Sequence, residues 1–75
     1  MTTSLLIRLD FPLNHVKDPV LYHLVKDYHL VPNIHSASIH AHEGGSLEIE
    51  VTGIQTDIDA GIAYLNGLGI MVAQL

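Results

Sequence analysis

Histidines and carboxylates lie close together near the middle of the chain. His40 and His42 alternate along one segment, and Glu48 and Glu50 alternate along the next. Imidazole and carboxylate groups are ligands for zinc and other divalent ions. Two histidines on a flat, open strand face do not make a closed coordination shell, so we interpret these residues as solvated surface groups and predict no metal. A divalent-metal site at His40 and His42 remains as a further alternative.

The other polar residues do not form a pattern typical of an enzyme. The chain has no cysteine, which excludes thiolate catalysis, and none of its six histidines stands at a triad-like spacing from a serine or carboxylate. The serines at 36, 38 and 46 lie on expected strands, without the sharp strand-to-helix turn that exposes a nucleophile. His35 is expected to point towards the helices as a hydrogen-bonded structural residue. We therefore predict no catalytic residues, no enzymatic activity and no cofactor.

Length and charge limit the classes of function further. The chain has 75 residues, which is enough for a single domain over residues 1–75. Its net charge of −5 opposes the phosphate neutralisation that nucleic-acid binding requires. Its apolar runs are far shorter than the ~20 residues of a membrane-spanning helix. We expect a cytoplasmic, water-soluble domain that neither binds nucleic acid nor inserts into a membrane.

Two periodicities predict the elements that position these residues. Apolar residues alternate with a period of two over 4–11, 33–42, 46–52 and 70–75, which is typical of strands. Helical spacing of apolar residues runs from Pro19 to about Tyr28, and a capping box of Thr56 and Asp59 opens a second helix that ends near Gly69. The order βαββαβ predicts the α+β ferredoxin-like sandwich, a four-stranded antiparallel sheet with two helices on one face.

The central hairpin sets which side chains face each other. A three-residue loop of Glu43-Gly44-Gly45, with Gly45 left-handed, keeps the odd-numbered apolar residues on one face. The pairs expected in this register are Ala41 with Leu47, Ile39 with Ile49, His40 with Glu48 and Ser38 with Glu50.

The last strand is apolar on both faces and carries no charge, although it should lie at an edge of the sheet. Unprotected edges tend to pair with another strand. This strand therefore favours dimerisation over a loosely packed carboxyl tail.

A concave site is expected where the loop 12–18 meets the start of the second strand at Asn33. The Asn33 amide both donates and accepts hydrogen bonds, as recognition of the charged ends of an amino acid requires. The alternative is that Asn33 only ends the turn after Pro32.

Several segments together resemble the NIL domain, a ferredoxin-like module related in shape to ACT domains. The resemblance covers nearly the whole chain and is carried by Leu6-Ile7-Arg8-Leu9-Asp10-Phe11, Asp18-Pro19-Val20-Leu21, Val31-Pro32-Asn33-Ile34, Ala60-Gly61-Ile62-Ala63-Tyr64-Leu65 and Gly69-Ile70. Family members lie at the carboxyl end of methionine-importer ATPase subunits, where paired copies bind methionine and inhibit transport, or beside four-iron ferredoxin segments. The resemblance implies a homodimer that binds a small ligand through Asn33 and Ile34, with His35 and Asn14 as further ligand-binding candidates.

This chain has neither an ATPase motor nor the cysteines of an iron–sulfur cluster, so transport and electron transfer are not expected of it. We expect a stand-alone regulatory domain that senses an amino acid, methionine-like, or a related metabolite. It would pass that state to a protein partner such as a transporter or an enzyme. The alternative is an interaction adaptor that docks a protein through the open sheet face or the last strand, without a metabolite.

Overall fold

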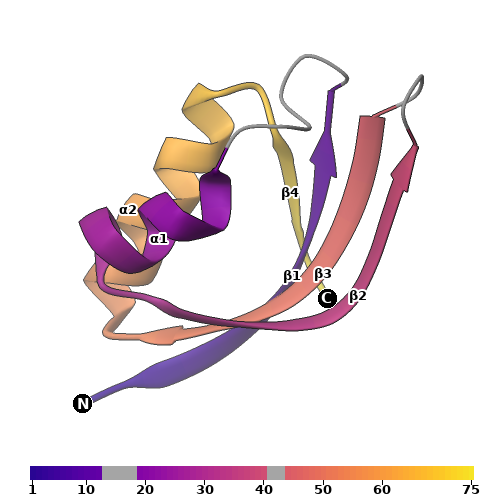
Figure 1. Cartoon of the computed structure of the whole chain (residues 1–75). Coiled ribbons are helices and arrows are strands. Elements are labelled where there is room, and N and C mark those ends of the chain that lie inside the picture. Colours follow the sequence, from indigo (N-terminus) through magenta and orange to yellow (C-terminus); the bar gives the residue numbers. More distant parts are fainter. Residues whose placement is uncertain (13–18, 41–43) are drawn as a thin grey trace.

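Six elements follow one another in the order β1, α1, β2, β3, α2, β4 (Figure 1). The computed structural model describes residues 1–12, 19–40 and 44–75, with only the backbone of residues 39 and 40. The elements are β1 (Thr3–Phe11), α1 (Val20–Tyr28), β2 (Val31–His40), β3 (Gly44–Gly53), α2 (Gln55–Gly67) and β4 (Met71–Gln74). The strands form one antiparallel sheet in the order β2-β3-β1-β4. The predicted ferredoxin-like α+β fold is confirmed.

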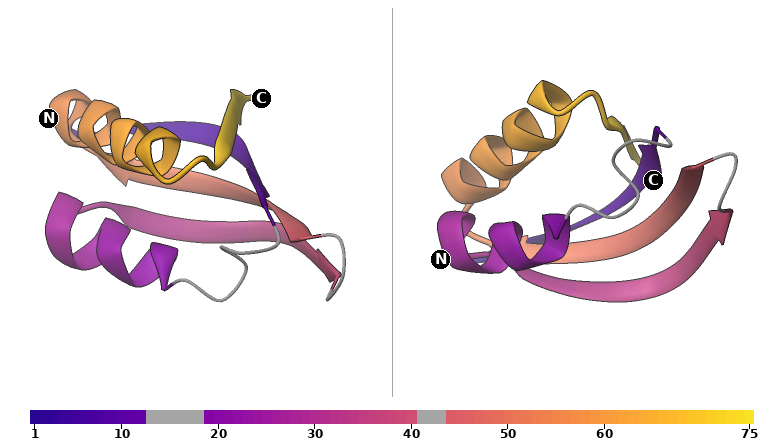
Figure 2. Two further views of the ribbon diagram at one scale, coloured as in Figure 1. Left: turned by 90° about the horizontal axis from the view of Figure 1, so that it is seen from above. Right: turned by 45° about the horizontal axis from the view of Figure 1, so that its top comes forward.

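Both helices cover the same face of the curved sheet, and the other face is open (Figure 2). On β1 and β3 the odd-numbered side chains point towards the helices, because strand side chains alternate between faces. These positions supply five of the eleven core residues, and both helices and the segments that flank them supply the rest: Ile7, Leu9, Leu47, Ile49, Val51, Val20, Leu24, Leu30, Ile58, Leu65 and Ile70. The expected inward direction of the odd-numbered aliphatic residues on β1 and β3 is confirmed.

Leu30, which the sequence patterns did not single out, joins the two helices to the sheet. It is buried between the end of α1 and α2, and a Cβ added at Gly61 would lie 2.8 Å from Leu30 Cδ1. The close approach of α2 therefore depends on Gly61, whereas Ala60 and Ala63 are exposed. Of the three small residues Ala60, Gly61 and Ala63, only Gly61 is buried.

The helix ends differ in part from the sequence-based expectation. The capping box was wrong: α2 begins at Gln55, its N-cap is Ile54 without a side-chain cap, and Gln55 Nε2 donates to Asp59 Oδ1 over 2.9 Å. Asp59 is thereby engaged inside the first turns and is not free to cap the helix. The predicted carboxyl-terminal glycine is correct, because Gly69 has φ 82° and follows Leu68, the C-cap of α2.

The register of the central hairpin was also wrong. Leu47 pairs with Ala37 and not with Ala41, so the two strands are displaced by four residues from the predicted pairing. His40 pairs with Gly44, and Glu48 pairs with Ser36. The cause is that both glycines belong to β3, with Gly44 in the positive-φ conformation at φ 90°. Because the displacement is an even number of residues, each side chain stays on the predicted face of the sheet.

An irregularity at His35 does change the face of the sheet to which part of β2 directs its side chains. The register shifts between Ile34 and Ser36, with Ile34 opposite Ile49 and Ala37 opposite Leu47. Because Ile49 and Leu47 both face the helices, Ile34 and Ala37 do as well, although their numbers differ in parity. A β-bulge has this effect, since one extra residue is inserted into one strand. His35, which was expected to point towards the helices as a structural residue, is the extra residue of this bulge and is exposed.

Candidate functional site

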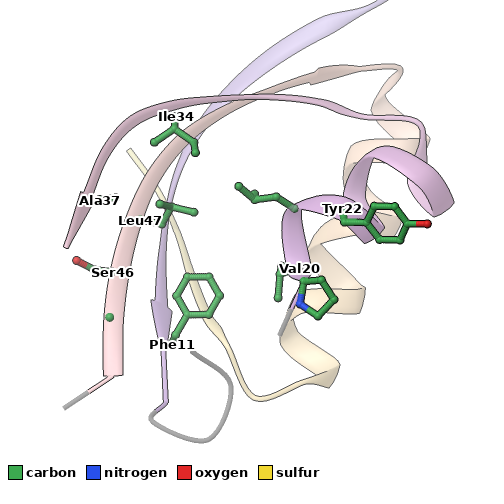
Figure 3. Close-up of a pocket in the computed structure, with 10 residues that line it drawn as sticks. Phe11, Val20, Tyr22, Ile34, Ala37, Ser46 and Leu47 are labelled. Carbon is green, nitrogen blue, oxygen red and sulfur yellow. The ribbon is translucent and has the colours of Figure 1, made fainter. Parts of the chain in front are cut away.

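An apolar groove lies between the first turn of α1 and the far half of the sheet (Figure 3). Its volume is about 340 Å³. The groove is lined by residues from the end of β1, the start of α1, the middle of β2 and the start of β3: Phe11, Pro19, Val20, Leu21, Tyr22, Ile34, Ala37, Gly45, Ser46 and Leu47. It is the part of the helix-facing surface that α1 does not cover.

The groove follows from the lengths of the elements. At about 3.3 Å per residue, the ten residues of β2 extend over roughly 33 Å, whereas the nine residues of α1 extend over only about 14 Å. The strands therefore continue beyond the helix that covers them, as the curved ends of β2 and β3 show (Figure 1). The β-bulge turns Ile34 towards this uncovered surface, where its ordinary strand position would turn it away.

The chemistry of the groove is that of a hydrophobic binding site. Among the residues that the structure describes, none that lines the groove carries a charge. The hydroxyl groups of Tyr22 and Ser46 point away from the cavity (Figure 3). Ligand pockets commonly measure about 300–1,000 Å³ and combine an apolar lining with a few polar groups. The groove is at the lower end of this range and suits an uncharged side chain of modest length.

The predicted ligand-binding residues lie around this groove in different ways. Ile34 lines it and points into it (Figure 3). Asn33 pairs with Glu50, which places it on the open face of the sheet, at the edge strand. His35 is the exposed residue of the bulge between them. Asn14 lies outside the described residues.

Sequence reasoning missed most of the groove. Phe11, Ala37 and Leu47 were interpreted only as members of the alternating strand patterns, and Val20 only as part of the apolar stripe of a helix. Their shared role depends on where α1 ends relative to the strands, and the apolar pattern of a strand does not reveal that distance. The one usable signal was the unequal length of the two kinds of element.

A second, shallower hollow lies on the open face at the same end of the sheet. Its volume is about 400 Å³, and it is lined by Arg8, Asp10, Phe11, Ser38, Gly44, Gly45 and Ser46. The charges in it neutralise each other, because Arg8 Nε lies 3.4 Å from Asp10 Oδ1. Its described residues therefore present no strong net charge to a ligand.

The proposed alternative of a metal site falls mainly outside the described residues. His42 and the side chain of His40 are not described, and Glu48 and Glu50 pair with other residues of β2. In the described segments, no group of three metal-binding side chains comes together.

Comparison with known proteins agrees with this architecture. The pattern of the NIL domain matches residues 5–74. The C-terminal domain of an ABC transporter ATP-binding protein from Enterococcus faecalis has a similar structure, with a TM-score of 0.84 and 27% sequence identity over 95% of this chain and 82% of that chain. No curated protein matches the sequence. No helix in the described part of the chain is long and apolar enough to cross a membrane. The match over nearly the whole length shows that the chain belongs to the NIL domain family.

Proposed function

We propose that this chain is a non-catalytic regulatory domain that binds a small molecule with an apolar side chain and polar ends, such as a methionine-like amino acid. The observation that carries this proposal is the groove of about 340 Å³ beside Ile34, whose described lining is apolar and without charge. A bound side chain there would remove apolar surface of both partners from water, which favours binding by about 25 cal/mol per Å². The expected ligand therefore has an uncharged chain.

The polar ends of the ligand would lie at the edge of β2. The bulge leaves peptide groups at His35 out of the regular ladder, which makes them available as donors and acceptors. The Asn33 amide lies at the same edge, although it belongs to the open face. A ligand whose chain enters beside Ile34 and whose head reaches over the edge would meet both kinds of group. This arrangement unites the predicted residues Asn33, Ile34 and His35 in one site.

The regulatory domain would act as a homodimer through β4. Met71 on this edge strand is 71% exposed, and the strand carries no charge that would oppose pairing with a second copy. The ligand would favour one arrangement of the two copies over another by binding it more tightly. The change in the arrangement of the dimer would be passed to a cytoplasmic partner, a transporter or an enzyme.

A thermal-shift screen over the natural amino acids tests the proposal. A ligand at about 100 times its Kd stabilises the folded state by ~2.7 kcal/mol, and each kcal/mol raises the Tm of a domain of this size by about 4–8 °C. We expect a shift above 10 °C for one or a few apolar amino acids. Ala37→Phe is the matched control, because it fills the groove from an exposed position. No shift in Tm with any amino acid, or an equal shift in the Ala37→Phe variant, would contradict the proposal.

A second candidate function is that of a protein adaptor without a metabolite. It is favoured by exposed apolar residues at the β4 side of the open face, where Leu75 lies beside the half-buried Leu6 and Met71 lies opposite Asp10. This alternative predicts no thermal shift with any amino acid. It also predicts that Met71→Lys abolishes capture of a partner protein.

A further inference from the structure

Within the described residues, the open face of the sheet carries one cationic side chain, that of Arg8, next to the carboxylate of Asp10. Both side chains point to this face, because Ile7 and Leu9, which alternate with them on β1, are buried beneath the helices. Arg8 Nε lies 3.4 Å from Asp10 Oδ1, and the two side chains are 47% and 44% exposed. Opposite charges therefore stand side by side at a surface that a solute can reach.

The hollow of about 400 Å³ around this ion pair exists because the other polar residues in it are small. In the register of the sheet, Ser46 of β3 lies between Asp10 of β1 and Ser38 of β2. Gly44, two residues before Ser46 on β3, has no side chain to fill the space. The Ser46 hydroxyl, which points away from the apolar groove (Figure 3), is both a donor and an acceptor. The hollow thus combines a cation, an anion and a hydroxyl group.

The guanidinium of Arg8 has donors that the described residues do not use. A guanidinium carries five N–H groups, and the contact with Asp10 uses only the one on Nε. Glu48 lies directly opposite Arg8 on β3, but the hydrogen bond that it accepts comes from Ser36 Oγ over 3.2 Å. No ion pair joins Glu48 to Arg8 within the described part of the chain. The two Nη groups of Arg8 are therefore available to a ligand.

We propose that this hollow is a second ligand site, which holds a small zwitterion with its carboxylate on Arg8 and its ammonium group on Asp10. The planar end of a guanidinium suits two parallel hydrogen bonds to a carboxylate. The ammonium group would contact Asp10 Oδ2, since Oδ1 is the oxygen near Arg8. An exposed ion pair contributes little to stability, so a ligand that rearranges this pair loses little in doing so.

The surroundings of the ion pair restrict the class of ligand further. Because Arg8 and Asp10 are adjacent, the two charges of the ligand must be adjacent as well, as they are on the α-carbon of an amino acid. Glu48 stands beside Arg8 on the same face and would repel an acidic side chain. A polar side chain would find the hydroxyl of Ser46. The expected ligand is therefore an α-amino acid with a polar, non-acidic side chain, unlike the apolar ligand of the groove on the other face.

An NMR titration of the isotopically labelled chain with L-glutamine, whose side chain is polar and uncharged, tests this site. We expect saturable shift changes at Arg8, Asp10 and Ser46 with a Kd of about 1 mM, the range of a small ligand held by a few partly exposed contacts. Arg8→Gln and Asp10→Asn should each raise Kd about fivefold, as the loss of one partly exposed charge pair predicts. Asp27→Asn is the matched control: it removes a carboxylate from the ion pair with His23 on α1 and should leave Kd unchanged.

Analogues of the probe test the same contacts on the unaltered chain. N-acetyl-L-glutamine lacks the ammonium charge, L-glutamine α-amide lacks the carboxylate, and 5-aminopentanoate keeps both charges at a wider spacing. Each should bind about fivefold more weakly than L-glutamine. Equal binding of any of the three, an unchanged Kd in both charge variants, or no saturation at about 20 mM would overturn the proposal.

The second site does not rest on the proposed function, and one variant separates the two. Ala37→Phe fills the apolar groove on the helix side and should leave the Kd of L-glutamine unchanged. Shift changes with L-glutamine that are confined to the groove, or that disappear in Ala37→Phe, would place the probe in the groove and overturn the second site. A chain that binds L-glutamine at Arg8 and no apolar amino acid refutes the proposed function alone.

Discussion

Ile34 lies directly opposite Ile49 in the sheet, yet Ile34 is 53% exposed whereas Ile49 is 0% exposed. Both side chains point to the helix side, because opposite residues of a strand pair share a face. Ile49 lies on β3, an inner strand beneath the helices, and Ile34 lies on β2 at the edge, beside the groove. The same type of side chain thus stabilises the core at one position and remains available for binding at the other.

Truncation of these two isoleucines separates binding from stability. Ile49→Ala should lower the free energy of unfolding by about 2–5 kcal/mol, because it leaves a cavity in the core. Ile34→Ala should lower it by less than about 1 kcal/mol, since half of the side chain is exposed, and should weaken ligand binding by about tenfold. Urea denaturation measures the first quantity and calorimetry the second. An Ile34→Ala chain with unchanged ligand affinity would place the ligand outside the groove.

Asn33→Ala tests whether the head of the ligand reaches over the edge of β2. The variant should fold normally, because Asn33 is exposed and no buried partner is left unsatisfied. The ligand should bind more weakly by roughly 1 kcal/mol, the usual net contribution of a hydrogen bond. Thr52→Ala, on the same open face but on β3, is the control and should not alter affinity. Calorimetric titration of both variants at constant pH measures whether the ligand affinity falls in Asn33→Ala and stays unchanged in Thr52→Ala.

The sequence predicted the fold well because alternation and helical spacing each report which residues are buried. β1 and β3 follow strict alternation, so Ile7, Leu9 and Ile49 were placed correctly in the core. Strand-pairing register is not encoded in the same way. Two glycines, Gly44 and Gly45, allow the hairpin to turn at several points, and each even displacement satisfies the alternation equally well.

The candidate site was harder to predict because it depends on an irregularity. A bulge adds one residue to one strand, and β2 gives little warning of it, since Ile34 and Ala37 are compatible with either face. The resemblance placed Ile34 in the ligand-binding segment, and the structure brings this residue to the groove. The opposite directions of Asn33 and Ile34 follow from ordinary strand alternation.

The contact between Gly61 and Leu30 predicts a coupled pair of substitutions. Gly61→Ala adds helix propensity of about 1 kcal/mol, but its Cβ would lie 2.8 Å from Leu30 Cδ1, and overpacking of this kind costs about 1–3 kcal/mol. The single variant should therefore be neutral or destabilised by up to about 2 kcal/mol. In a Leu30→Val background, which shortens the opposing side chain, the same change should become stabilising. Additive free energies of unfolding in this double-mutant cycle would show that the two residues do not compete for space.

Charge on β4 should weaken the proposed dimer. Met71→Lys places an ammonium group at a 71% exposed position of the edge strand, where inserted lysines oppose strand pairing. The variant should remain folded and shift the assembly towards the monomer in sedimentation experiments. Asn66→Lys, on the exposed surface of α2, is the matched control and should leave the assembly unchanged. A Met71→Lys chain that sediments like the wild type would show that β4 is not the dimer interface.

Two glycines at the end of α2 should respond to alanine in opposite directions. Gly67 is the last residue of the helix and Gly69 lies two residues later, and a Cβ added at either position would meet no atom within 4 Å. The two positions therefore do not differ in steric contact with the rest of the fold, but they do differ in backbone conformation. Gly69 has φ 82°, where a side chain costs about 1–2 kcal/mol, so Gly69→Ala should lower stability by that amount. Gly67→Ala should raise stability by about 0.5–1 kcal/mol through helix propensity and a less flexible unfolded chain. Loss of stability in both variants would mean that α2 does not end at Gly67.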